Sequence, residues 1–201
     1  MGNDTRALRY RDTLSRREKA LRLIWGAVWL VLFRPTPRWA FHGWRRQLLR
    51  LFGAKVGTGC RISPSCSVWA PWNLEMGDYV ALADNVDCYS VAKIRIGTKA
   101  AVSQRSFLCA ASHDPSSLLR PLRRKPITVQ NHAWIAAEVM VLPGVTIGEG
   151  TVVAARSVVT KDLPPWRICV GNPCVPKSRR QVFDLHLDPS IKSLDVVETG
   201  R

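Results

Sequence analysis

The sequence has little of three features that would each point to a function: histidine, acidic residues and long apolar runs. Its 201 residues include four histidines, and 15 acidic side chains stand against 30 basic ones. Six cysteines are present, but none forms a CxxC pair or is grouped with histidine at zinc-ligand spacing. This argues against a zinc site built on cysteine. Two interpretations of the cysteines remain: small buried side chains in a reducing compartment, or disulfides.

The one marked apolar run is "LIWGAVWLVLF", residues 23–33. It is too short to span a bilayer as a straight helix, which takes about 20 residues. Arg34 and Arg38 follow it, and no small-x-small cleavage site does, which argues against a cleaved signal peptide. Three interpretations stay open: a helix at a membrane interface or between subunits, a helix buried within its own chain, and a membrane-inserted hairpin or signal anchor.

Positive charge is concentrated at the start of the chain. Residues 1–55 contain thirteen basic side chains and three acidic ones. Such an excess attracts polyanions, namely nucleic acid, anionic lipid or acidic saccharide. The segment carries no recognisable nucleic-acid-reading motif, and arginines beside an apolar helix favour a membrane surface. We therefore expect an anionic membrane surface as a partner and no nucleic acid.

What the sequence does contain is a six-residue repeat. From residue 129 an apolar residue recurs at every sixth position, at Val129, Ile135, Val141, Ile147, Val153 and Val159. Shorter series upstream start at Val56, Met76 and Ile96, which are 20 residues apart, so one turn is three hexapeptides plus an inserted dipeptide. This period fits neither an α-helix nor a long strand. It predicts short strands joined by corners, three to a coil, with the apolar residue inside and about five coils stacked as an all-β solenoid.

The open ends of such a solenoid need covering. We expect helices over residues 15–33 and 39–52, separated by "RPTPR", to cap the first coil. The predicted organisation is a basic helical segment over residues 1–55, a coil over 56–178 with a loop inserted at 114–126, and a C-terminal tail over 179–201.

Several stretches resemble a known family. "AWIAAEVMVLPGVTIGEGTVVAARSVVTKDLPPW", followed by "VGNP", resembles the C-terminal coils of the hexapeptide-repeat acyltransferases. "NLEMGDYV" and "LCAASHD" with "KPITV" resemble the colanic-acid-biosynthesis-type acetyltransferases within that family, and the resemblance covers about residues 34–178. It implies a left-handed parallel β-helix, acetyl-CoA as acyl donor, a homotrimer and a role in polysaccharide biosynthesis. The hand comes from the resemblance alone, because periodicity does not set it.

His113 is the candidate catalytic residue. The strict repeat stops beside it and resumes at Ile127, which predicts His113 at a corner, facing outward next to the inserted loop. Acyl transfer from a thioester to a hydroxyl needs a general base, and a neutral imidazole is suited to that task. The resemblance implies this role, and the alternative is an inert corner histidine. Asp114 or a backbone carbonyl would orient the ring, while Asn85 or Gln104 would hold the acceptor hydroxyl unless they are ordinary corner residues.

The resemblance also implies that coenzyme A lies in a groove between two neighbouring prisms. The matching positions are Trp134, Ala136, Ala137, Ala154, Ala155, Thr160 and Lys161. One departure from the family pattern is Val175, where related sugar acetyltransferases often carry arginine. Lys177, Arg179 and Arg180 are the candidates to replace it.

The predicted function is O-acetyl transfer from acetyl-CoA to a saccharide or lipid-linked polysaccharide precursor, in the cytoplasm or on the inner membrane face. One alternative is a non-catalytic scaffold or membrane-surface binding protein. Another is a γ-type carbonic anhydrase, which needs three zinc-binding histidines, whereas only His113 and His132 fall within the predicted coil. We therefore expect no metal. The sequence does not specify the sugar, the hydroxyl or the length of the acyl group.

Overall fold

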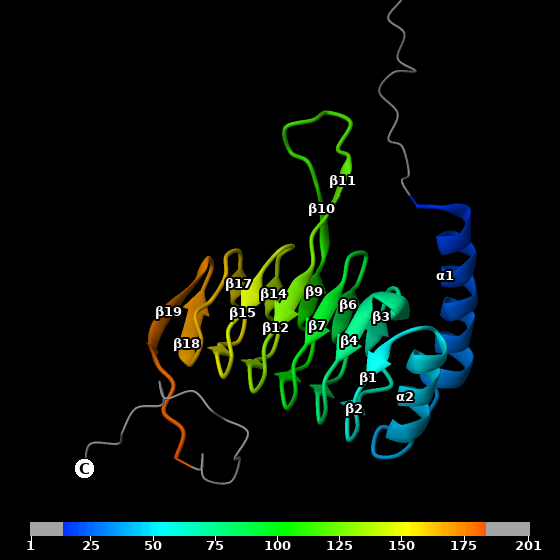
Figure 1. Cartoon of the computed structure of the whole chain (residues 1–201), viewed down its shortest axis with the longest axis horizontal. Helices are drawn as coiled ribbons and strands as arrows, with labels where there is room; N and C mark the ends of the chain where they lie inside the picture. The colour runs from blue at the N-terminus through cyan, green and yellow to red at the C-terminus, as the bar shows by residue number, and fades with distance from the viewer. Residues whose placement is uncertain (1–13, 184–201) are drawn as a thin grey trace, which may run out of the picture.

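The computed structural model describes residues 14–183, which form a three-sided parallel β-helix with helices at its N-terminal end (Figure 1). The chain passes through the three sides in turn, here named sheets A, B and C. Sheet A contains β1 (Lys55–Val56), β4 (Leu74–Met76), β7 (Ile94–Ile96), β12 (Ile127–Val129) and β15 (Thr146–Ile147). Sheet B contains β2 (Arg61–Ile62), β5 (Ala81–Leu82), β8 (Ala101–Val102), β13 (Trp134–Ile135), β16 (Val152–Val153), β18 (Arg167–Gly171) and β19 (Cys174–Arg179). Sheet C contains β3 (Ser67–Val68), β6 (Asp87–Tyr89), β9 (Phe107–Cys109), β14 (Met140–Val141) and β17 (Val158–Val159).

Apolar side chains at the hexapeptide positions fill the inside of the prism. Strand pairing in sheet B places in one row the buried residues Ile62, Leu82, Val102, Ile135 and Val153. Sheets A and C each have five parallel strands, one from each coil. The predicted all-β solenoid is therefore confirmed, and so is the six-residue spacing that aligns its core.

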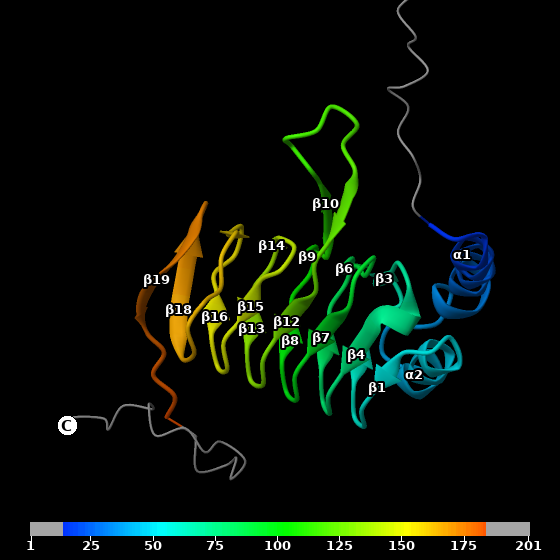
Figure 2. The ribbon, with the colours of Figure 1, turned by 45° about the horizontal axis from the view of Figure 1, so that its top comes forward.

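Helices cover the first coil (Figure 2). They are α1 (Arg16–Val28), the π-helix η2 (Trp29–Phe33), which continues α1, and α2 (His42–Leu51); a short 3₁₀ helix, η3 (Pro71–Asn73), lies further on. The predicted ranges 15–33 and 39–52 thus match two helical segments, the second starting three residues later than expected. Ser15 begins α1 with a capping box, in which Ser15 and Glu18 each bind the other's backbone N–H.

The cap satisfies the backbone edge of the first coil. Backbone N–H groups of each coil donate to carbonyls of the next coil, as Ser67 of the first coil does to Val86 of the second. The strand carbonyls of the first coil therefore have no preceding coil from which to accept hydrogen bonds. Side-chain donors from the helices replace it: Trp25 donates to the Val68 carbonyl at 2.7 Å and Trp29 to that of Cys66 at 2.9 Å. Three arginines act in the same way, Arg45 on Ile62, Arg46 on Cys60 and Arg50 on Val56. The N-terminal edge is therefore closed to pairing with another strand.

The apolar run at residues 23–33 has two different faces. Trp25 and Phe33 are buried against the first coil, whereas Leu23, Leu30 and Val31 are 76%, 56% and 65% exposed. One face thus packs within the chain, as one of the three interpretations proposed. Among residues 14–183 no helix is long and apolar enough to cross a bilayer.

Both ends of the chain extend past the described residues. Of the thirteen basic side chains counted at the start of the chain, Arg6, Arg9 and Arg11 lie outside the described residues. At the other end β19 turns back on β18 as an antiparallel strand and ends at Arg179. Most of the predicted tail, residues 184–201, lies outside the described residues. The six cysteines are free thiols and five of them are buried, as the first of the two interpretations expected.

Candidate active site

His113 lies on a hairpin that projects from the solenoid (Figure 1). Strand β10 (Ala111–His113) pairs antiparallel with β11 (Leu122–Arg124), with His113 opposite Leu122. The chain therefore leaves the coil at Ala110, whose carbonyl accepts from the Lys125 N–H as the chain returns. The prediction that His113 is the last corner residue before a loop at 114–126 is corrected: the projection starts earlier, and His113 is part of its stem. The sequence pattern missed this because Ser112 and His113 complete the hexapeptide that starts at Leu108, and the repeat is interrupted only after them.

The imidazole of His113 is held by a backbone carbonyl. Its Nδ1 atom lies 2.6 Å from the carbonyl oxygen of Arg120, across the hairpin. A carbonyl can only accept a hydrogen bond, so Nδ1 carries the proton and, in the neutral ring, Nε2 carries the lone pair. The side chain is exposed. This is the tautomer and the accessibility that a general base for a bound hydroxyl requires.

Asp114 organises the hairpin. Its carboxylate accepts from the Ser116 hydroxyl at 2.6 Å and from the Arg123 guanidinium. These hydrogen bonds, from Ser116 first and Arg123 second, lower the pKa of the Asp114 carboxyl to about 2. Asp114 and a backbone carbonyl were the two groups considered above for orienting the ring. Nδ1 of His113 contacts the Arg120 carbonyl, whereas Asp114 binds Ser116 and Arg123 within the hairpin.

The two candidate acceptor residues lie at the other edge of sheet C. Asn85 precedes β6 and Gln104 precedes β9, whereas His113 follows β9. Because the strands are parallel, Asn85 and Gln104 share the edge where sheet C begins, and His113 stands beyond the edge where it ends. One chain does not bring these three side chains together.

Most of the candidate donor residues share the edge with Asn85. Trp134 is on the outer face of β13, 47% exposed, and its indole N–H donates to the Ser103 hydroxyl at 3.0 Å. The corner after sheet B carries a row of small residues connected by coil-to-coil backbone bonds, namely Ser63, Ala83, Ser103, Ala136 and Ala154. Ala137 and Ala155 come next along the chain at the same corner. We call this row, with Trp134, the small-residue track.

Thr160 and Lys161 lie elsewhere. They follow β17 and are exposed at the edge where sheet C ends, the same edge as His113. The candidate residues thus form two groups on opposite edges of one sheet. Of the three basic residues considered in place of an arginine at 175, Lys177 and Arg179 are exposed on β19. The Arg180 guanidinium donates to the carbonyls of His132 and Gly150 in its own chain.

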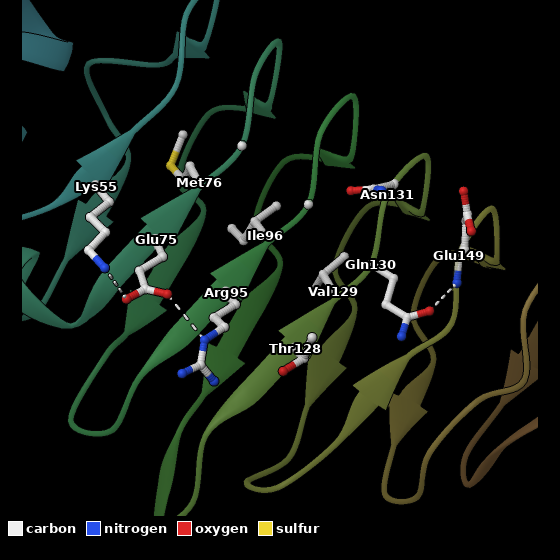
Figure 3. A pocket seen from close by; sticks show the side chains of 12 residues that line it. Lys55, Glu75, Met76, Arg95, Ile96, Thr128, Val129, Gln130, Asn131 and Glu149 are labelled. Carbon is white, nitrogen blue, oxygen red and sulfur yellow. Dashed lines mark hydrogen bonds and ion pairs between the residues drawn. The ribbon is translucent and has the colours of Figure 1, made fainter. Parts of the chain in front are cut away.

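A groove of about 600 Å³ on sheet A is lined by polar side chains, several of which bind one another or the backbone (Figure 3). Glu75 pairs with Lys55, Lys93 and Arg95 across three coils. These contacts, that of Lys93 foremost, lower the pKa of Glu75 to about 2. At the other end the Gln130 side chain accepts from the backbone N–H of Glu149 at 2.8 Å. The charged and amide groups therefore serve the stacking of the coils.

Within residues 14–183 no three histidine, cysteine, aspartate or glutamate side chains gather where they could hold a metal ion. His113 is on the hairpin after sheet C, and His132 is at the corner between sheets A and B. One chain thus offers no cluster for the carbonic anhydrase alternative.

Comparisons with known proteins agree with this architecture. Residues 126–161 match the family model described as bacterial transferase hexapeptide (six repeats). A protein of Escherichia coli K12 named "Putative colanic acid biosynthesis acetyltransferase WcaF" is 45% identical over 152 residues, covering 76% of this chain and 83% of the relative.

Two solved structures are similar over most of the chain. A hexapeptide-repeat-containing acetyltransferase of Vibrio cholerae, complexed with acetyl coenzyme A, has a TM-score of 0.77 and 28% identity over 85% of this chain and 93% of that one. A maltose O-acetyltransferase of Clostridium difficile has a TM-score of 0.72 and 25% identity over 84% and 90% of the two chains.

Proposed function

Because this chain belongs to the hexapeptide-repeat acetyltransferase family, we propose that it transfers an acetyl group from acetyl-CoA to a saccharide hydroxyl, with His113 as the general base. The observation that carries the proposal is the bond between His113 Nδ1 and the Arg120 carbonyl, because it presents Nε2 as the proton acceptor. The names of the relatives support the acetyl donor and the saccharide: one is complexed with acetyl coenzyme A, one is a maltose O-acetyltransferase, and one is named for colanic acid biosynthesis.

The chemistry needs only one acid–base group. As the acceptor oxygen attacks the thioester carbonyl, Nε2 of His113 removes the hydroxyl proton and the ring becomes an imidazolium stabilised by the Arg120 carbonyl. The carbon–sulfur bond then breaks, and the thiolate of coenzyme A takes the proton back from Nε2. An acetate ester and a free thiol result, and His113 is neutral again. The thioester is already activated, so no serine or cysteine nucleophile is required.

A complete site needs two copies of the chain. The small-residue track with Asn85 and Gln104 lies at one edge of sheet C, while His113, Thr160 and Lys161 lie at the other. When the track of one prism faces the hairpin edge of its neighbour, donor, acceptor and base meet in the groove between them. A closed ring of three prisms would form three identical grooves, so we propose a homotrimer.

Mixed oligomers test the shared site directly. A chain with His113→Ala lacks the base, and a chain with Ala155→Trp has a filled track at an exposed corner; each alone should be inactive. Co-expressed in equal amounts, they should regain activity at about a quarter of the sites, those that combine an intact hairpin with an intact track. Activity is measured as thiol release from acetyl-CoA with a maltose acceptor. No recovery in the mixture would refute the shared site.

Binding of acetyl-CoA separates the enzyme from the scaffold alternative. Calorimetric titration should give one donor site per chain, and Ala155→Trp should remove it, whereas a scaffold would not bind the donor. Release of thiol only in the presence of a saccharide, together with a mass increase of that saccharide, would then establish the transfer.

We further propose that the outer face of the helical cap rests on an anionic membrane surface. Leu23, Ile24, Leu30 and Val31 form an exposed apolar face on α1 and η2, and Arg16, Arg17 and Lys19 adjoin it on the first turns of α1. Apolar side chains beside cations suit the headgroup boundary of an anionic leaflet. Such a position on the inner membrane face would give a cytoplasmic enzyme access to a lipid-linked acceptor.

A further inference from the structure

A second pocket lies where the helical cap meets sheet B. It has a volume of about 380 Å³, and its walls include Arg38, Trp39, His42, Arg61, Ala81 and Ala83. The first three come from the end of the linker between the helical segments and from the start of α2, and the others come from the first two coils. We call it the cap pocket. The pocket shares Ser63 and Ala83 with the small-residue track, whereas Arg38, Trp39, His42 and Arg61 have no role in the donor, acceptor or base sites described above.

Two arginines with different surroundings flank the cap pocket. Within residues 14–183 the guanidinium of Arg61 makes no hydrogen bond or ion pair, and the side chain is exposed. Arg38 is held by Asp84 at 2.9 Å, and Asp84 in turn accepts from the hydroxyls of Ser63 and Ser65. Asp84 therefore positions Arg38, while the charge of Arg61 has no counterion in the described part of the chain.

A third cation stands behind the pocket wall. Arg45 is fully buried, and its five hydrogen-bond partners are all neutral: the carbonyls of Ile62, Pro37 and Ala40, the Thr36 hydroxyl and Nδ1 of His42. Its charge is therefore solvated by dipoles without being cancelled. His42, which lines the pocket, accepts from Arg45 at 2.9 Å. Burial first, and then the charges of Arg45, Arg61 and Arg46, lower the pKa of His42, which indicates a positive potential at this wall.

The cap pocket is continuous with the small-residue track. Strand register aligns Ala81 with Ala101 and Ala101 with Trp134, and Ser63 and Ala83 are the first members of the track itself. Asn85 follows the Arg38-bound Asp84 along the chain. Trp39 is 85% exposed at the pocket mouth and offers an apolar plane beside the cations. A ligand in the cap pocket would thus lie at the N-terminal end of the face on which we place the donor.

We propose that the cap pocket binds an anionic group, a carboxylate or a phosphate, on the saccharide that accepts the acetyl group. Arginine is the side chain best matched to these groups, because its planar fork donates two parallel hydrogen bonds to their oxygens. Arg61 supplies the free fork, Arg38 a second donor, and the uncancelled charge of Arg45 favours any anion at this wall. Trp39 covers the apolar side of the sugar ring. This inference rests on the proposed function, since it names the class of acceptor for that site.

Paired acceptors test the inference. Methyl β-glucuronide and methyl β-glucoside differ only at C6, which is a carboxylate in the first and a CH2OH group in the second, and glucose 1-phosphate provides the phosphate arm. The ring hydroxyls on C2, C3 and C4 are common to both glycosides, so the comparison uses acetylation at these positions. We expect transfer to an anionic sugar to exceed transfer to the glucoside in kcat/KM, and Arg61→Gln to reduce that ratio about tenfold, the effect of losing one charge-assisted contact. Preference for the glucuronide or for the sugar phosphate would identify which anion the acceptor carries.

The matched control is Lys55→Gln. Lys55 is also in the first coil and 80% exposed in its side chain, but it lies on sheet A against Glu75, so its loss should leave the ratio unchanged. Equal use of charged and neutral sugars by the unaltered protein, or an unchanged ratio in Arg61→Gln, would overturn the inference. So would an equal fall in Lys55→Gln, because that would reflect net charge alone.

A binding measurement separates this inference from the proposed function. Saturation-transfer NMR with methyl β-glucuronide, without acetyl-CoA, should show contact that Arg61→Gln weakens. If that contact is present but no acetyl transfer occurs to any sugar, the proposed function is wrong and the anion site stands. If transfer occurs but the glucuronide does not bind more tightly than the glucoside, the anion site is wrong and the function stands.

Discussion

Replacing His113 by alanine should remove most of the catalytic rate and almost none of the fold. The side chain is exposed, and its bond to the Arg120 carbonyl contributes about 0.5–1.5 kcal/mol net to stability. The hairpin keeps its backbone ladder between β10 and β11 and the pairing of Asp114 with Arg123. A positioned general base contributes about 10²–10⁴ in rate, which corresponds to about 3–5.5 kcal/mol of activation free energy. The loss in kcat should therefore far exceed any loss of folding stability.

The assay follows thiol release from acetyl-CoA at saturating donor, with kcat and KM measured separately and the melting temperature recorded for each variant. His113→Gln is the second variant, because its amide can still donate to the Arg120 carbonyl but cannot accept the hydroxyl proton. We expect both variants to lose kcat while the KM for acetyl-CoA changes little, since the track in which we place the donor is intact.

The control for a histidine in the coil is His132→Asn. His132 has a left-handed backbone conformation, φ 57°, which asparagine tolerates, so this variant should fold and keep its rate. Near-full activity of His113→Ala would refute the general-base assignment. Equal losses in His113→Ala and His132→Asn would show that the assay reports a general disturbance of the coil.

Three further outcomes are expected. The ion pairs of Glu75 lower its pKa from an ordinary 4.5 to about 2, so the stability they contribute is fully present above about pH 4.5 and is lost as the pH falls through 2. Between about pH 2 and pH 4.5 the melting temperature of Glu75→Gln should therefore change less with pH than that of the unaltered chain. Gly97→Ala should lower the free energy of unfolding by about 1–3 kcal/mol in denaturant titrations, because the added Cβ would lie 2.5 Å from the Asn131 backbone nitrogen. Gly26→Ala on helix α1 has nothing within 4 Å of the added Cβ, so this control should be neutral or stabilising by up to about 1 kcal/mol. The reverse order of the two variants would contradict the close stacking of the coils at Gly97. Serine at both Leu23 and Val31 should reduce co-sedimentation with anionic vesicles by roughly tenfold or more without lowering the melting temperature, and unchanged sedimentation would exclude this face as the membrane contact. Substitution is the sharper test, because deleting residues 1–33 would also remove Trp25 and Phe33 from the core.

The sequence by itself determined the solenoid, its period and most of its inner residues. Each hexapeptide forms one side of the prism, and the 20-residue interval between the series starting at Val56, Met76 and Ile96 gives three sides to a turn. The row from Ile62 to Val153 was therefore predictable from spacing alone. That spacing can be recognised in the sequence without any information on contacts between residues far apart in the chain. The helical cap was also predictable, because a solenoid end exposes backbone groups that something must cover.

The sequence also suggested His113 as the candidate base, because a chemically versatile side chain stands where the repeat breaks. It did not identify the group that orients the ring. The Arg120 carbonyl is a backbone atom, so no residue type at position 120 would have revealed it. It did not separate the two faces of residues 23–33 either, since Trp25 and Leu23 are both apolar and only packing against the first coil buries one and exposes the other.

Only the tertiary structure decided which candidate residues share an edge. Positions such as Gln104 and His113 are nine residues apart in sequence, yet a strand of sheet C runs between them and carries them to opposite edges of the prism. The same stacking brings Arg38 and Arg61, from different segments, to one pocket in front of Arg45. Spacing along the chain sets the side of the prism on which a residue lies. Contacts between the coil and the cap, and side-chain contacts between coils, arise only when the chain has folded, because they join residues that the repeat does not relate to one another.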